Sequence, residues 1–255
     1  MILLRAGNAS EWTGPTGNNT YLFRGSPSIL IDAGVGESSH VAAIERELGG
    51  TTLDLVLITH GHVDHVAGVP ALQGRWPLVV VRGGPGEPLR DGERIRLESN
   101  RNSLVAVATP GHAPDHFCFL DEDTREIYCG DLARRGGTIV IPASRGGSLR
   151  EYLDSLRRVR DLRPSRLLPA HGPVIEDPDD LIDEYIVHRA ERQRQVLAAL
   201  ADGCVSADDI VTRIYPEISG ALRPAAVETV LAHLEGVRPL KGPDPDSASR
   251  SSDDS

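Results

Sequence analysis

The stretch "THGHVDH" at residues 59–65 follows directly on the apolar run "LDLVLI" at residues 53–58. It holds three of the nine histidines of a 255-residue chain, together with one carboxylate. An apolar run of this kind predicts a strand covered on both faces. The imidazoles are therefore expected in the loop where this strand ends.

The spacing of these side chains favours metal binding. His60 and His62 stand two residues apart on an extended segment, so both point to one side and can reach one cation. Asp64 and His65 open the next helix, where they can turn toward a second cation. Imidazole nitrogens and carboxylate oxygens are the ligands that Zn²⁺ accepts.

Three later loops supply further candidate ligands, each after a predicted strand. "TPGH" places His112 after "SLVAVAT", "CGD" places Asp131 after "EIYC", and "PAHG" places His171 after "SRLL". Taken alone, such loop residues are ordinary. Together with the first cluster and in this order, they predict one site of seven ligands.

The hydrophobic pattern alternates strands with helices through the first two thirds of the chain. Strands are predicted at 20–24 and 28–32 (a hairpin), 53–58, near 78–82 and 104–109, and in "HFCFL", "EIYCGD" and "SRLL". Helices are predicted in "SSHVAAIERELGG", after Asp64 and in "SLREYLDSLRRVRDL". Only helices are predicted after about residue 177.

This order of motifs, T-H-x-H-x-D-H followed by P-G-H, G-D and H-G, resembles the metallo-β-lactamase superfamily. The resemblance implies an αβ/βα sandwich of two mixed sheets with helices outside and a dinuclear site where the sheets meet. It implies that His60, His62 and His112 hold the first metal. Asp64, His65 and His171 would hold the second, with Asp131 bridging both. The metallo-β-lactamase core is expected over residues 1–176.

Within the superfamily, "GNNTYL", "HGPVI" and "YIVHRAERQRQVL" resemble the β-lactamase-like protein 2 group. That group ends in a small winged-helix-like domain, so a helical, winged-helix-like extension is expected over 177–240. After "LAHLEG" we find no pair of wing strands, and we therefore expect helical packing against the core. The polar, acidic tail 241–255 is expected to be disordered.

Composition narrows the class of protein. The net charge of −10 disfavours a nucleic-acid partner, because phosphates attract basic surfaces. Cys118, Cys129 and Cys204 form no close pair. There is no signal-like segment and no apolar run that would span a membrane. These features favour a reducing cytoplasm, and oligomeric state is not predicted.

The predicted chemistry is hydrolysis by a hydroxide that bridges two divalent cations, whose charge lowers the pKa of the water. Asp64 and Asp131 are the predicted catalytic carboxylates. Two Zn²⁺ ions suit the histidines, and iron or manganese is also compatible with the fold. Arg134, Arg135 and Arg145 are candidates to bind an anionic part of the substrate.

The substrate remains open between several classes. A small-molecule ester, thioester or lactone is the first expectation. The alternative is a single-strand endoribonuclease or phosphodiesterase, as the resemblance to the β-lactamase-like protein 2 group suggests. An antibiotic β-lactamase, an iron-dependent oxidoreductase and a metal-binding scaffold for a protein partner are weaker alternatives. Of the other polar residues, Asp32 is expected to support the ligand loop by hydrogen bonding. Asn18 and Asn19 are expected either at the mouth of the site or in a turn.

Overall fold

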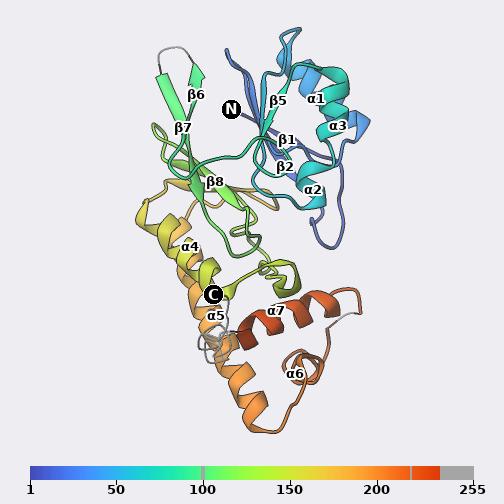
Figure 1. The fold of residues 1–255 in the computed structure, drawn as a ribbon, viewed down its shortest axis with the longest axis vertical. Helices are drawn as coiled ribbons and strands as arrows, with labels where there is room; N and C mark the ends of the chain where they lie inside the picture. The colour runs from blue at the N-terminus through green and yellow to red at the C-terminus, as the bar shows by residue number, and fades with distance from the viewer. Residues whose placement is uncertain (99–100, 219, 236–255) are drawn as a thin grey trace, which may run out of the picture.

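Two five-stranded sheets form the centre of the molecule in a computed structural model that describes residues 1–98, 101–218 and 220–235 (Figure 1). The first sheet has the order β1-β2-β3-β4-β5 and contains β1 (Ile2–Arg5), β2 (Asn19–Phe23), β3 (Ile29–Ile31), β4 (Leu55–Leu57) and β5 (Val80–Arg82). The second has the order β10-β9-β8-β7-β6 and contains β6 (Arg94–Glu98), β7 (Arg101–Ala108), β8 (Phe117–Asp121), β9 (Glu126–Gly130) and β10 (Arg166–Pro169). Each sheet mixes parallel and antiparallel pairs.

The strands bury both faces, and alternate residues enter different cores. On β3, Ile29 and Ile31 lie between the sheets, while Leu30 faces the helices outside. On β9, Tyr128 lies between the sheets, while Ile127 and Cys129 face outward. This explains why these strands read as continuous apolar runs.

Helices cover the outer face of each sheet. On the first sheet lie α1 (Ser38–Leu48) and α3 (Val69–Arg75), whose Ile44 and Leu72 pack beneath it. On the second lie α4 (Leu149–Asp161) and α5 (Pro178–Ala201), through Leu156 and Leu181 among others. The predicted αβ/βα sandwich is thereby confirmed.

Two strands at the outer edges of the sheets, β1 and β6, were not predicted from the sequence. The sequence of β1, "ILLR", lies at the very start of the chain and is too short to show a period. The sequence of β6, "RIRLE", alternates between polar and apolar residues, but it holds only two apolar residues. These are Ile95 and Leu97, which are buried between the sheets.

The C-terminal helices form a smaller body beside the sandwich (Figure 1). The lower half of α5, α6 (Ala207–Ile214) and α7 (Arg223–Glu235) share a core of their own that includes Val196, Ile210 and Val230. The expectations about a wing and a disordered tail concern residues 236–255, which lie outside the described residues. Among the described helices, none is long and apolar enough to cross a bilayer.

Helix α7 is attached to the core through the short helix η1 (Ala143–Arg145). The backbone N–H of Ser144 donates to Glu228 at 2.9 Å, and its hydroxyl donates to the same carboxylate at 2.8 Å. The N–H of Ile141 also donates to the Thr229 hydroxyl at 3.4 Å. These contacts place α7 beside the loop that follows Asp131.

Candidate metal centre

All seven expected ligands lie at one edge of the sandwich, on loops that leave the carboxyl ends of β4, β7, β9 and β10. His60 and His62 follow β4, Asp64 and His65 belong to the one-turn helix α2 (Val63–Val66), and the others follow strands of the second sheet. Both sheets therefore contribute ligands. The structure brings together the seven residues that the motifs single out, in three overlapping groups of potential metal ligands.

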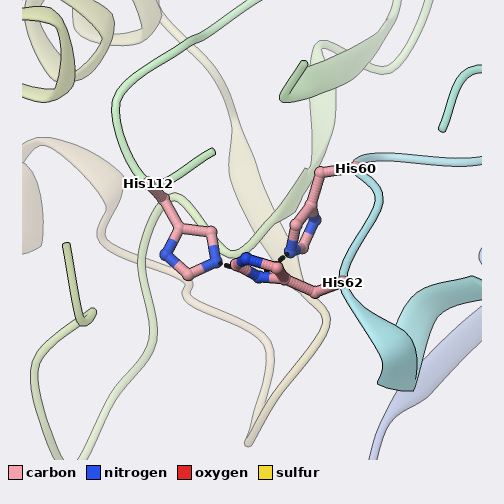
Figure 2. Close-up of side chains that lie close together, drawn as sticks. All are labelled: His60, His62 and His112. Carbon is pink, nitrogen blue, oxygen red and sulfur yellow. Dashed lines mark hydrogen bonds between the residues drawn. The ribbon is translucent and has the colours of Figure 1, made fainter. Parts of the chain in front are cut away.

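The first group is His60, His62 and His112 (Figure 2). His62 Nδ1 lies 2.9 Å from His60 Nε2 and 2.9 Å from His112 Nε2. His112 Nδ1 is bonded to the Val140 carbonyl at 2.7 Å, which fixes its proton on that nitrogen. The Nε2 lone pair of His112 therefore points at the other two rings.

These imidazoles are held in the neutral form. Burial, followed by the charges of nearby histidines, lowers the pKa of His60 well below its usual value. Burial likewise lowers the pKa of His62 to about 4. Neutral imidazole is the form that binds a metal.

The second group is Asp64, His65 and His171, with Asp131 between the two groups. His171 Nε2 lies 3.1 Å from Asp131 Oδ1 and 3.3 Å from Asp64 Oδ2. The other oxygen of Asp131, Oδ2, lies 3.5 Å from His112 Nε2 in the first group. Each oxygen of Asp131 thus faces a different group of ligands.

The electrostatics of the second group call for positive charge. Burial alone would raise the pKa of Asp131, but His171 and His65 outweigh it and hold that pKa well below the usual range. Burial lowers the pKa of His171, yet Asp131 and Asp64 raise it to about 9. The carboxylates of Asp64 and Asp131 therefore favour a positive charge beside them, such as a bound cation would supply.

The residues present fit a pair of divalent cations. Donors that share one ion at 2.0–2.2 Å in a tetrahedron stand about 3.4 Å apart. The donor separations given above range from 2.9 to 3.5 Å, and His65 Nε2 stands 3.6 Å from Asp64 Oδ2, so small shifts of the side chains would bring the donors to this value. His65 Nε2 and Asp131 Oδ1 are buried without any hydrogen-bond partner among the described residues. Such orphaned atoms are expected where an ion binds.

Asp32 supports the ligand loop, in line with its expected role. Its Oδ2 accepts a hydrogen bond from His65 Nδ1 at 2.8 Å, which leaves Nε2 free to face the site. Its Oδ1 accepts one from the Thr59 N–H at 2.8 Å. Asp32 has a positive φ of 61°, so the chain turns sharply at this residue.

Asn18 and Asn19 do not lie at the mouth of the site; both are buried. Asn18 Nδ2 donates at 3.1 Å to the carboxylate of Asp64. Asn19 Nδ2 donates to the carbonyls of Pro169 and Gly172 at 2.8 and 2.9 Å. They fix the second group of ligands.

Sequence reasoning missed His116, which is buried beside the first group. Its Nδ1 is bonded to the Thr109 hydroxyl at 2.8 Å, and its Nε2 accepts from the backbone N–H of Asp131 at 3.1 Å. It therefore positions the backbone of Asp131. The available signal was a second histidine four residues after His112 in "HAPDH".

A pocket of about 870 Å³ opens onto the ligands. Arg134 and Arg145 line it, whereas Arg135 does not: it pairs with Asp177 and borders a smaller neighbouring cavity. The other walls come from the loop around Trp12, the loop 136–142 and, in the C-terminal body, Tyr215, Ile218 and Leu222 before α7 and Ala225, Ala226 and Thr229 on α7. Two candidate substrate-binding arginines out of three thus face the site.

Comparison with known proteins identifies the family. The model of the metallo-beta-lactamase superfamily matches residues 13–94 and 91–171. A model of the beta-lactamase associated winged helix domain matches residues 206–236, most of which lie in α6 and α7. The chain belongs to the metallo-beta-lactamase superfamily and is a hydrolase of that superfamily, whose members bind divalent metals in a dinuclear site.

Two relatives illustrate the range of similar proteins. The beta-lactamase-like protein 2 homolog of Caenorhabditis elegans is 30% identical over 84% of this chain and 76% of its own length. An atrochrysone carboxyl ACP thioesterase of Aspergillus fumigatus is 34% identical over 72% of this chain, but that stretch is only 44% of the relative.

Solved structures show the same fold. The metallo-beta-lactamase family protein TTHA1429 of Thermus thermophilus superposes with a TM-score of 0.77, covers 92% of both chains and is 23% identical. The protein TTHA1623, solved in a di-iron-bound form, superposes with a TM-score of 0.54 over 64% of this chain and 91% of its own, at 26% identity. The first match includes the C-terminal helices.

Proposed function

We propose that this chain hydrolyses a small-molecule ester, thioester or lactone with two Zn²⁺ ions held by His60, His62, Asp64, His65, His112, Asp131 and His171. The observation that carries the proposal is Asp131, whose two oxygens face two separate groups of ligands. Bound there, the cations would polarise the substrate carbonyl and supply hydroxide at neutral pH.

The residues around the ions have separate tasks. The carboxylate of Asp64 is partly exposed to the pocket and accepts a hydrogen bond from Asn18. Burial raises the pKa of Asp64, but the hydrogen bonds from His171 and Asn18 and the charge of His65 together outweigh this and lower it to about 2. As a carboxylate at neutral pH, Asp64 can accept a hydrogen bond from the attacking water and orient it. Asp131 is more enclosed and is proposed to hold the two sites together.

Acyl transfer to water is favoured by the shape and lining of the pocket. It is large enough for a metabolite-sized ligand. Its two arginines can bind one anionic group, while an RNA strand requires a basic path for several phosphates. The name of the Aspergillus fumigatus relative, a thioesterase, supports the same class of substrate.

The deciding experiment is a substrate panel with metal analysis. The purified protein is assayed on esters, thioesters, lactones, a cephalosporin and labelled single-stranded RNA, with and without added Zn²⁺. We expect metal-dependent hydrolysis of acyl substrates and about two zinc ions per chain. Cleavage of RNA with no acyl turnover would overturn the proposal, and an iron content with redox activity would overturn the choice of metal and reaction.

The variant Asp131→Asn tests the bridging role. We expect it to lose at least about 100-fold in kcat/KM and to retain fewer than two metal ions per chain. Circular dichroism checks that the fold is kept, and Asp115→Asn, a carboxylate outside the predicted ligand set, is the control. Full turnover by Asp131→Asn would contradict the dinuclear mechanism.

A further inference from the structure

Part of the pocket wall comes from the C-terminal helical body. Tyr215, Ile218, Leu222, Ala225, Ala226 and Thr229 line the same pocket as His62, Asp64 and His171. The sandwich alone therefore leaves the pocket open on this side.

Two large exposed apolar side chains from distant parts of the sequence line this pocket. Among the described residues with large exposed hydrophobic side chains, Trp12 is 48% exposed and Leu222 is 38% exposed, and both line it. They lie 210 positions apart in the sequence, so the fold brings them to one place. Apolar surface that gathers at a pocket marks a ligand with an apolar part.

The wall is held in a fixed position. Arg192 stacks on the ring of Tyr215 at 4.2 Å, and Tyr215 and Ile218 pack on the core of the C-terminal body. Arg134 donates to the carbonyl of Trp12 at 2.8 Å on the other side of the pocket. Side chains anchored in this way are ordered before a ligand binds, which lowers the cost of binding a ligand that covers them.

We infer that the six lining residues Tyr215, Ile218, Leu222, Ala225, Ala226 and Thr229 form the acyl-binding wall of the active site and select substrates with a bulky apolar acyl group. This inference rests on the proposed function of the same pocket. A small acyl group such as acetyl would leave most of the 870 Å³ to water, whereas a long one would cover Leu222 and Trp12. The C-terminal body would thus recognise the substrate rather than a nucleic acid.

The test compares N-acetylcysteamine thioesters of acetyl, hexanoyl and decanoyl acids on the zinc-loaded protein. For the unaltered chain we expect kcat/KM to rise at least tenfold from acetyl to decanoyl. In Leu222→Ser the ratio of decanoyl to acetyl should fall about tenfold, mainly through KM, and Leu222→Met should restore it. The matched control is Leu197→Ser, because Leu197 is 44% exposed on α5 and does not line the pocket.

A binding measurement separates recognition from catalysis. Decanoate should change the tryptophan fluorescence of the metal-free protein, and Trp12→Phe should abolish the change. The second tryptophan, Trp76, is buried in the core beneath the first sheet. Binding of decanoate should weaken in Leu222→Ser and stay unchanged in Leu197→Ser.

The outcomes distinguish the two proposals. Equal rates on acetyl and decanoyl thioesters, or an equal effect of Leu222→Ser on both, would overturn the acyl wall and leave the hydrolase proposal standing. No turnover of any acyl substrate would overturn the proposed function instead. Cleavage of single-stranded RNA that depends on Leu222 would overturn the assignment of this wall to an acyl group.

Discussion

The buried histidines have different structural roles, and these roles cannot be read from the residue type alone. His60 and His112 belong to a group of candidate metal ligands, His116 bonds to the backbone of Asp131, and His40 on α1 belongs to no such group among the described residues. The difference lies in the partner of each ring nitrogen. His40 has the Thr20 hydroxyl at 2.8 Å on one nitrogen and no partner among the described residues on the other.

His40 should make the fold sensitive to mild acid. Burial lowers the pKa of His40 to about 4. Between pH 6.5 and 4, His40 is therefore protonated in the unfolded chain but neutral in the folded chain. Stability is therefore complete above pH 6.5 and is lost as the pH falls, by about 3 kcal/mol in all. In urea unfolding, the free energy of unfolding of His40→Gln should depend less on pH between 6.5 and 4 than that of the unaltered chain. If the free energies of unfolding of the two proteins differ by the same amount at pH 7 and at pH 4.5, His40 does not cause this loss of stability.

Gly130 is required by the close packing around Asp131. A Cβ on Gly130 would lie 2.8 Å from His116 Nε2 and 2.9 Å from Thr59 Cβ, and its φ is 50°. Gly130→Ala should therefore cost about 2–4 kcal/mol and weaken zinc binding. The control is Gly49→Ala, whose φ is 60° with open space around it, so it carries only the backbone cost. Equal losses in thermal unfolding of the two variants would rule out the packing argument.

At the scale of elements, the sequence predicted most of what positions the ligands. Apolar runs that end in "TH", "PGH" and "GD" could be placed on strands, because a buried strand needs apolar residues on both faces. The edge strands β1 and β6 and the bonds of Asn18 and Asn19 to distant loops escaped prediction. These features depend on contacts between segments far apart, which no local pattern records.

The attachment of α7 to η1 could not be predicted either, since Ser144 and Glu228 lie 84 positions apart. Glu228→Ala should lower the free energy of unfolding by about 1 kcal/mol and raise KM for the decanoyl thioester, because α7 carries part of the proposed acyl wall. Glu191→Ala on α5, which removes an exposed pair with Arg194, is the control. If both variants behave alike, the position of α7 does not matter for substrate binding.

At the scale of the molecule, the ligand set joins the two sheets. His60, His62, Asp64 and His65 extend from the first sheet, and His112, Asp131 and His171 extend from the second. The sequence could give the seven candidate ligands and their order, whereas their meeting at one edge follows from the packing of the sheets against each other. Ions bound there would link the two sheets, and the free energy of unfolding should therefore depend on them.

Removal of metal should therefore destabilise the whole core. A ligand present at 100 times its dissociation constant contributes about 2.7 kcal/mol, which for a chain of this size corresponds to a change in Tm of about 5–10 °C. We expect dialysis against a chelator to lower Tm by at least this amount and added Zn²⁺ to restore it. Asp131→Asn, in which the bridge is weakened, should respond less. An unchanged Tm in protein shown by metal analysis to be metal-free would mean that the sheets hold together without the ions, and that the ligand groups serve chemistry alone.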